Sequence, residues 1–334
     1  MMRVVKWLVV LLVFASLVLW GGYRYWETRL DVPLVVSSER LFEVPEGAGY
    51  HRVIDKLENE GLINDGWAYR LLTRIKPEAI PSLRPGEYRL EPGMTGPELF
   101  EALDTHDVVT YTLTIPEGWT FAKMRDALEN ADKLDHQLSG VSDEDVMALL
   151  GRDGEHPEGR FFPDTYRYHK GVSDTEILRL ALNNMDARLD AVWAERDEDI
   201  TLKTPYEALI MASLIERETG APEERREIAG VFKRRMQQGM RLQTDPTVIY
   251  GMGDAYTGNI TRADLRKPTP YNTYVIDGLP PTPIALPGLA ALEAAVNPAD
   301  GDTLYFVSRG DGTHKFSKTL REHNNAVNRY IRNR

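Results

Sequence analysis

The chain has 334 residues, a formal net charge of −11 and no cysteine. The negative charge argues against a nucleic-acid partner, because binding to a phosphate backbone needs a basic face. The lack of cysteine excludes a disulfide scaffold, a thiolate metal site and a cysteine nucleophile. The seven histidines are scattered, so we predict neither a metal site nor a cofactor, and we interpret the basic run 233–235 as a solvated helix face.

Residues 7–23 carry no charge, and together with their neighbours they approach the roughly 20 apolar residues that span a bilayer. No small-residue cleavage site follows, whereas Trp20 and Trp26 are typical of an interfacial belt. We therefore predict an uncleaved anchor over residues 7–26 rather than a cleaved signal peptide. The tail 1–6 is expected in the cytoplasm, with residues from about 30 onward outside.

Two segments, 44–59 and 115–130, align without gaps and share a Pro-Glu-Gly turn. Each predicts a strand, a turn and an amphipathic helix. A duplication explains the likeness, and so does the common preference of such junctions for proline and glycine. Residues 113–121 also resemble the opening of a LysM module, which binds glycan backbones containing N-acetylglucosamine.

A strand over 85–90 and a helix after the capping box of residues 95–98 complete the first region. The polar stretch 139–158 contains several turn residues and is interpreted as a linker. We accordingly predict a LysM-like α/β region over 40–150 and a second domain over 155–334.

A helix is predicted from the capping box Thr204–Glu207 to about Gly220. Helical periodicity places Glu218 on the apolar stripe with Leu214 and Ile215, and turns Glu216 toward solvent on the opposite side. Desolvation and the negative end of the helix both raise the pKa of a carboxyl at position 218. Such a carboxyl suits a general acid. The alternative is a helix cap, or a pair with Arg217 or Arg225.

A second helix is predicted from Pro222 to about Gly239. The segment 240–251 then reads as a loop rich in groups that bind hydroxyls and amides, and 270–274 repeats this composition. Carbohydrate sites combine such polar groups with aromatic faces. The candidate substrate-binding residues are Thr219, Gln243, Asp245, Tyr250, Asn272 and Tyr274.

Several long motifs resemble one family, the endolytic murein transglycosylases of the YceG-like type. They are Ile215-Glu216-Arg217-Glu218-Thr219, the run 241–251, Tyr271-Asn272-Thr273-Tyr274, the proline-rich run 278–284, Phe162-Pro163-Asp164-Thr165-Tyr166, Asn297-Pro298 and Leu304-Tyr305-Phe306-Val307. The lead into the 162–166 motif, Gly159-Arg160-Phe161, is less apolar than the family pattern.

The resemblance implies an α+β protein of the bacterial inner membrane: a single transmembrane helix, small LysM-like subdomains and a YceG-type catalytic domain. It implies cleavage of the β-1,4 bond between N-acetylmuramic acid and N-acetylglucosamine within nascent peptidoglycan, leaving 1,6-anhydro-muramyl ends and ending strand elongation. The family's acid/base glutamate falls on Glu218. Penicillin-binding synthases are the implied protein partners.

Two rival functions stay open at this stage. One is a water-dependent muramidase, in which Asp245 supplies the second carboxylate that most glycosidases need. The structural alternative for Asp245 is a cap of the turn before Pro246. The other rival is a membrane-anchored, non-catalytic scaffold that binds glycan.

Overall fold

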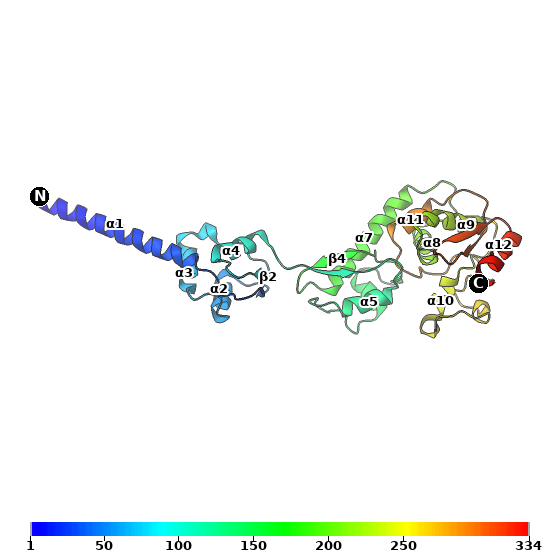
Figure 1. Cartoon of the computed structure of the whole chain (residues 1–334), viewed down its shortest axis with the longest axis horizontal. Coiled ribbons are helices and arrows are strands. Elements are labelled where there is room, and N and C mark those ends of the chain that lie inside the picture. Colours follow the sequence, from blue (N-terminus) through cyan, green and yellow to red (C-terminus); the bar gives the residue numbers. More distant parts are fainter. Residues whose placement is uncertain (1, 333–334) are drawn as a thin grey trace. The chain divides into compact units, whose positions relative to one another are not determined.

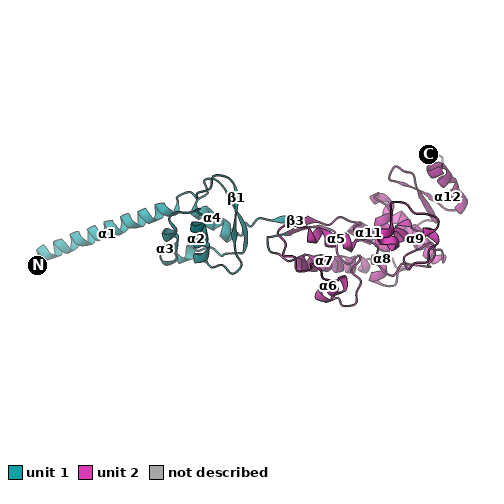
Figure 2. Ribbon diagram, turned by 90° about the horizontal axis from the view of Figure 1, so that it is seen from below, with its two compact units in different colours: residues 1–111, 168–171 teal, residues 112–167, 172–334 magenta. Residues whose placement is uncertain are grey.

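The computed structural model describes residues 2–332, which form two compact units. Unit 1 contains the chain up to Tyr111 together with Tyr168–Gly171, and unit 2 contains residues 112–167 and the chain from Val172 onward (Figure 2). Met1 of the predicted cytoplasmic tail lies outside the described residues.

Unit 1 begins with one long helix followed by a small mixed α/β fold (Figure 1). Its elements are α1 (Met2–Leu30), β1 (Arg40–Val44), α2 (Tyr50–Asn59), α3 (Gly66–Ile75), the 3₁₀ turn η1 (Pro77–Ala79), β2 (Gly86–Leu90) and α4 (Gly96–Thr105).

Helix α1 is long and apolar enough to cross a membrane. Its last turns belong to the core of unit 1. Trp26 is 3% exposed and donates a hydrogen bond from Nε1 to the carbonyl of Ala68 at 2.8 Å, and Leu30 is also buried. The apolar helix therefore continues into the folded unit.

Strands β1 and β2 pair antiparallel, with Phe42 opposite Tyr88, and both side chains are fully buried. The predicted capping box at the start of α4 is present: the Thr95 amide donates to the Glu98 carboxylate at 2.7 Å. Gly47 closes the turn between β1 and α2 at φ +66°, a conformation that suits glycine.

Unit 2 is mostly helical, with short strands at its edges. It contains most of β3 (Tyr111–Thr114), α5 (Phe121–Glu129), α6 (Asp143–Leu149), most of β4 (Thr165–Tyr168), α7 (Asp174–Ala194), α8 (Pro205–Glu218), η2 (Pro222–Glu224), α9 (Arg225–Gln237), α10 (Asp245–Met252), η3 (Gly253–Ala255), η4 (Asp264–Arg266), α11 (Leu289–Val296), β5 (Tyr305–Ser308), β6 (His314–Ser317), α12 (Leu320–Val327) and the π-helical turn η5 (Asn328–Arg332). β3 pairs with β4, and β5 pairs antiparallel with β6.

Helix α8 is the central helix of unit 2. It contacts α7, α9, α10 and α11, and every residue from Ala208 to Ile215 is buried. The predicted bounds are confirmed, and the Thr204 hydroxyl accepts a hydrogen bond from the amide of Glu207 at 3.1 Å. The predicted single apolar stripe is wrong, because α8 is covered on all sides between Ala208 and Ile215.

The second strand–turn–helix segment, β3 to α5, is part of unit 2. Its glycine, Gly118, has φ +76° and donates its amide to the carbonyl of Leu286 at 2.9 Å, and the Leu286 amide donates to the carbonyl of Trp119 at 2.7 Å. Arg217, in the last turn of α8, donates to the carbonyl of Gly118 at 3.0 Å. The second Pro-Glu-Gly turn therefore supports the end of the central helix.

Three sequence interpretations differ from the structure. The predicted linker 139–158 contains α6 and the fully buried Val146. The run 240–251 is not only a loop, because α10 begins at Asp245. The basic run 233–235 is not a solvated face: Lys233 and Arg235 are each 7% exposed, and Arg235 donates to three main-chain carbonyls. Buried guanidinium groups are stable where carbonyls satisfy their donors.

Candidate active site

Glu218 is the last residue of α8, and its side chain is partly buried. Its Oε1 accepts a hydrogen bond from the hydroxyl of Thr244, which precedes α10. The two residues lie on different elements, so the contact depends on the packing of α10 against α8. The neighbours of Thr244 in the chain, Gln243 and Asp245, are both exposed, so the site is reached from the surface.

Burial raises the pKa of Glu218 from its ordinary value to about 7, and the nearby negative charge of Asp245 adds to the rise. Two effects oppose it: the hydrogen bond from Thr244 and the positive charge of Arg235 favour the ionised form. At neutral pH the carboxyl is therefore poised between its protonated and ionised forms. Such a group can both donate and accept a proton.

Thr244 is held in place by a buried cluster of hydroxyls. Its amide donates to the Thr273 hydroxyl at 3.0 Å, and its carbonyl accepts from the Thr247 hydroxyl at 2.7 Å. The hydroxyls of Thr247 and Thr273 are 2.9 Å apart, and all three residues are at most 1% exposed. The hydroxyl that contacts Glu218 thus projects from a fixed backbone.

Three of the predicted substrate-binding residues surround this cluster. Asp245 is the first residue of α10, and it accepts a hydrogen bond from the hydroxyl of Tyr274 at 2.6 Å. Gln243 has a left-handed backbone with φ +51°, which is costly for a residue with a side chain. Its amide donates to the carbonyl of Thr273 at 3.2 Å. Asp245 and Tyr274 lie close enough to Glu218 to interact with its charge, and Gln243 directly precedes Thr244, which bonds to Glu218.

The other three predicted residues bond within the protein. The Asn272 side chain is 1% exposed; it donates to the carbonyls of Asp264 and Lys267 and accepts from the amide of Tyr274. Tyr250 donates its hydroxyl to a carboxylate, Glu158, at 3.1 Å. These contacts favour a supporting role for both side chains, and their contact with substrate stays a prediction.

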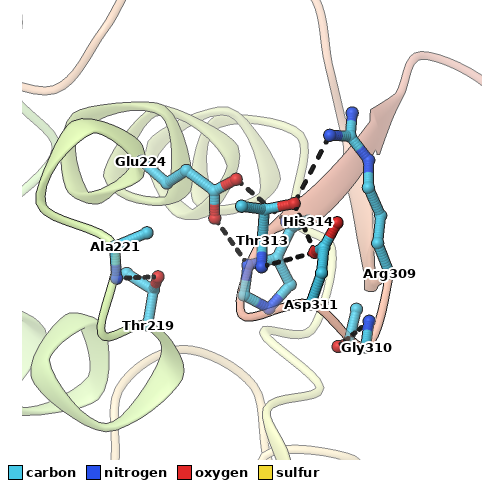
Figure 3. Close-up of polar contacts among 9 residues, drawn as sticks. Thr219, Ala221, Glu224, Arg309, Gly310, Asp311, Thr313 and His314 are labelled. Atoms are coloured by element: carbon cyan, nitrogen blue, oxygen red, sulfur yellow. Dashed lines mark hydrogen bonds and ion pairs between the residues drawn. The ribbon is translucent and has the colours of Figure 1, made fainter.

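The turn that follows Glu218 is fixed at both ends (Figure 3). Thr219 is 5% exposed, and its hydroxyl accepts from the amide of Ala221 at 2.9 Å. At the other end, Glu224 accepts from the backbone amide of His314 at 2.9 Å and contacts its ring Nδ1 at 2.7 Å. The start of β6 therefore holds the segment next to the site, and Thr219 serves that turn.

The prediction that Glu216 is solvated is wrong. Its side chain is 7% exposed; it accepts from the amide of Gly288 at 3.1 Å and pairs with Arg225 at 3.5 Å. Arg225 also lies 3.8 Å from Glu117, and Arg217 bonds to a carbonyl. The two arginines considered as partners for Glu218 are thus engaged elsewhere.

Two neighbours of Glu218 were missing from the predicted site. The sequence Thr-Asp-Pro at 244–246 is a helix-start signal that the interpretation of 240–251 as a loop does not use, and nothing local links Thr244 to Glu218. Arg235 was hidden in a basic run. Both are brought to the site by packing of elements that are distant in sequence.

The arrangement offers one partly buried carboxyl with a pKa near neutrality, beside exposed polar groups. Cavities of about 610 and 520 Å³ lie elsewhere: the first is lined by residues of α1, α3 and α4, the second by residues of α7 and α11. Neither is lined by Glu218. The chemistry that the site supports is proton donation and acceptance by a single carboxyl at a surface-accessible position.

Comparison with known proteins covers almost the whole chain. A family model described as the YceG-like family matches residues 42–329. An endolytic murein transglycosylase of Bacillus subtilis is 28% identical, over 94% of this chain and 91% of that protein. One of Streptococcus pneumoniae is 27% identical, over 96% of this chain and 64% of its own length. A crystal structure of a YceG-like protein from Listeria monocytogenes matches with a TM-score of 0.56 and 30% identity, over 87% of this chain and 100% of that one.

Proposed function

The chain belongs to the YceG-like family, and we infer that it is an endolytic murein transglycosylase, a lyase that cuts peptidoglycan strands. The mechanism is inferred from the state of Glu218, which is a partly buried carboxyl with a pKa of about 7 and is hydrogen-bonded to the Thr244 hydroxyl. We propose this residue as the catalytic acid and base. The bond cleaved is the β-1,4 linkage from N-acetylmuramic acid to N-acetylglucosamine.

The reaction needs only one such group. Protonated Glu218 donates its proton to the glycosidic oxygen as the bond from the anomeric carbon breaks. The resulting carboxylate then takes the proton of the C6 hydroxyl of the same muramic acid, and that oxygen forms a bond to the anomeric carbon. The products are a free sugar hydroxyl and a 1,6-anhydro end. Water is not consumed, and Glu218 regains its proton.

The charged neighbours of Glu218 fit both halves of this cycle. Asp245 favours the protonated form that donates, and Arg235 together with the Thr244 hydroxyl favours the carboxylate that accepts. Exposed Gln243 and Asp245 and the nearby Tyr274 are proposed to hold the sugars. We assign Asn272, Tyr250 and Thr219 to the support of these groups rather than to first contact with glycan.

The products distinguish this reaction from a water-dependent muramidase. We expect mass spectrometry of digested glycan strands to show 1,6-anhydro-muramyl ends with no incorporation of ¹⁸O from labelled water. Reducing-end muramic acid carrying ¹⁸O would instead assign the second-carboxylate role to a residue such as Asp245. Internal cutting is read from the shortening of long strands before disaccharides accumulate.

We also propose that α1 anchors the chain in the bacterial inner membrane, with the part of unit 1 that follows α1 and all of unit 2 on the extracytoplasmic side. The absence of cysteine makes this testable, because a single introduced cysteine is a unique label. Cysteine at the exposed Glu129 is expected to react with a membrane-impermeant maleimide in intact spheroplasts, whereas cysteine at Arg3 is expected to react only after lysis. The reverse pattern would contradict the orientation.

A LysM-like glycan-binding role for the two strand–turn–helix segments is a further part of the proposal. Their structural equivalence supports it: β1 and α2 occupy the aligned positions of β3 and α5, with a glycine of positive φ in each turn. Coupling to penicillin-binding synthases is proposed because strand cutting must keep pace with strand synthesis. Binding of purified glycan by Glu218→Gln enzyme tests the first point without cleavage.

A further inference from the structure

Glu158 is a buried carboxyl that the proposed reaction does not use. It is 3% exposed, and no basic side chain of residues 2–332 lies within ion-pair distance of it. Its carboxyl accepts hydrogen bonds from the amide of Phe121 at 3.0 Å, from the hydroxyl of Tyr250 at 3.1 Å and from the amide of the next residue, Gly159. Burial raises its pKa to about 7. A carboxyl without a cation is expensive to bury, so packing alone does not account for it.

Two of the donors to Glu158 belong to different helices. Phe121 is the first residue of α5, and its ring stacks on that of Phe161 at 4.9 Å. Tyr250 is in the second turn of α10, and its ring meets that of Tyr271 edge-on, also at 4.9 Å. The hydroxyl of Tyr271 lies 2.9 Å from that of Thr282. Glu158 therefore joins α10 to α5.

Helix α10 leads from this contact to the proposed acid. Tyr250 follows Asp245 by five residues, which is about 8 Å along a helix. Asp245 directly follows Thr244, whose hydroxyl bonds to Glu218. A short helix moves as a rigid body, so a tilt at Tyr250 changes the position of the Thr244 hydroxyl. A displacement of about 1 Å at a reacting group can lower a rate a hundredfold.

We propose that Glu158 is a positioning residue: by accepting the hydroxyl of Tyr250 it fixes α10 and holds Thr244 against Glu218. The proposal rests on the proposed function of Glu218 as the acid. It also gives the Tyr250 hydroxyl an internal role in place of a contact with substrate.

Four variants of the full-length enzyme test it: Glu158→Ala, Tyr250→Phe, the double variant and Glu158→Gln. We expect each of the first two to lower kcat about tenfold with KM within about twofold, and the double variant to be no worse than either. Glu158→Gln is expected within about threefold of wild type, since its amide oxygen still accepts from Phe121 and its amide nitrogen can donate to the Tyr250 oxygen. Glu155→Gln is the matched control, because it makes the same substitution at a nearby carboxyl that pairs with Arg160 at 2.8 Å instead of accepting from Tyr250.

A rise in KM with unchanged kcat for Tyr250→Phe would overturn the proposal and give that hydroxyl a substrate contact. The proposal would also be overturned if the loss of kcat in the double variant equalled the product of the two single losses. The same holds if Glu158→Gln lowered kcat as much as Glu158→Ala. If Glu158→Ala does not fold, Tyr250→Phe, which removes one oxygen, carries the kinetic test.

Release of anhydro ends by wild type in the same assay tests the proposed function separately. If wild type releases no anhydro ends, a double-mutant cycle in unfolding free energy tests the Glu158–Tyr250 contact. Losses of unfolding free energy that simply add in the double variant would overturn the proposal.

Discussion

The last turn of α8 carries two glutamates two residues apart, and their surroundings differ in kind. Glu216 is enclosed: it accepts from the Gly288 amide and pairs with Arg225. Glu218 is partly buried, its one described bond is from a hydroxyl, and exposed Gln243 and Asp245 lie beside it. Burial raises the pKa of both carboxyls, so burial alone does not identify the acid.

The difference lies in what each carboxyl can still do. A carboxylate held by a cation and a backbone amide has its proton-accepting positions occupied, and its ionised form is favoured by its partner. A carboxyl held by one hydroxyl keeps an oxygen available for substrate. We therefore infer that Glu216 stabilises the fold and that Glu218 carries out the reaction. Four predictions test this difference, from the largest expected effect to the smallest.

Glu218→Gln is expected to reduce glycan cleavage by about 10³-fold, because the amide keeps the shape of the side chain but neither donates nor accepts the proton. The assay is the rate at which anhydro ends appear. Glu216→Gln is the matched control, and we expect it to keep activity within about threefold of wild type per folded molecule. If the Glu218→Gln variant cleaved glycan faster than the Glu216→Gln variant, the roles of the two glutamates would be reversed.

Thr244→Val is expected to lower the maximal rate about tenfold, since it removes the hydroxyl that orients the acid. It also changes the pH dependence. The acid must be protonated, so activity falls as pH rises through the pKa of Glu218, which is about 7. The Thr244 bond lowers that pKa, and its loss moves the alkaline limb of kcat/KM to higher pH. A limb that stays in place or moves down would contradict the contact.

Glu216→Gln is expected to lower the free energy of unfolding by about 1–2 kcal/mol, because it weakens the pairing with Arg225 and keeps only a neutral bond to Gly288. Urea unfolding measures the change. Glu218→Gln is expected to be as stable as wild type or more stable at pH 8, since it replaces a carboxylate whose ionised form burial disfavours. Equal losses in the two variants would remove the distinction.

Asp245→Asn gives the smallest expected effect, with the opposite sign to that of Thr244→Val. The negative charge of Asp245 raises the pKa of Glu218, so its removal moves the alkaline limb to lower pH. Asparagine keeps an oxygen for the Tyr274 hydroxyl, which limits structural change. Complete loss of activity would instead favour a direct catalytic role for Asp245. The measurement is again kcat/KM against pH.

The sequence predicted the elements that depend on local signals. The bounds of α8, the capping box of α4 and the order strand, turn, helix in both Pro-Glu-Gly segments are confirmed. These features follow from capping residues, periodicity and glycine at positive φ. Membership of the family followed from long motifs rather than from physical reasoning on single residues.

The surroundings of the site could not be predicted in the same way. Periodicity identifies a buried face only where another face meets water, and α8 has no such face between Ala208 and Ile215. The exposure of Glu216 was therefore misjudged. Glu158 ends the polar, turn-rich stretch 139–158 that is interpreted as a linker, and its partners, Phe121 and Tyr250, are far away in sequence. Their pairing depends on tertiary packing that no local pattern encodes.

The bond from Arg217 to Gly118 has a practical consequence for work with shortened proteins. A fragment that starts at residue 155, where the sequence alone suggests a domain boundary, lacks this carbonyl and the backbone bonds between 118–119 and Leu286. The end of α8 would lose a brace directly beside Glu218. A soluble fragment meant to retain activity should therefore begin ahead of β3, so that it contains both the second Pro-Glu-Gly turn and α8, the helix that this turn supports.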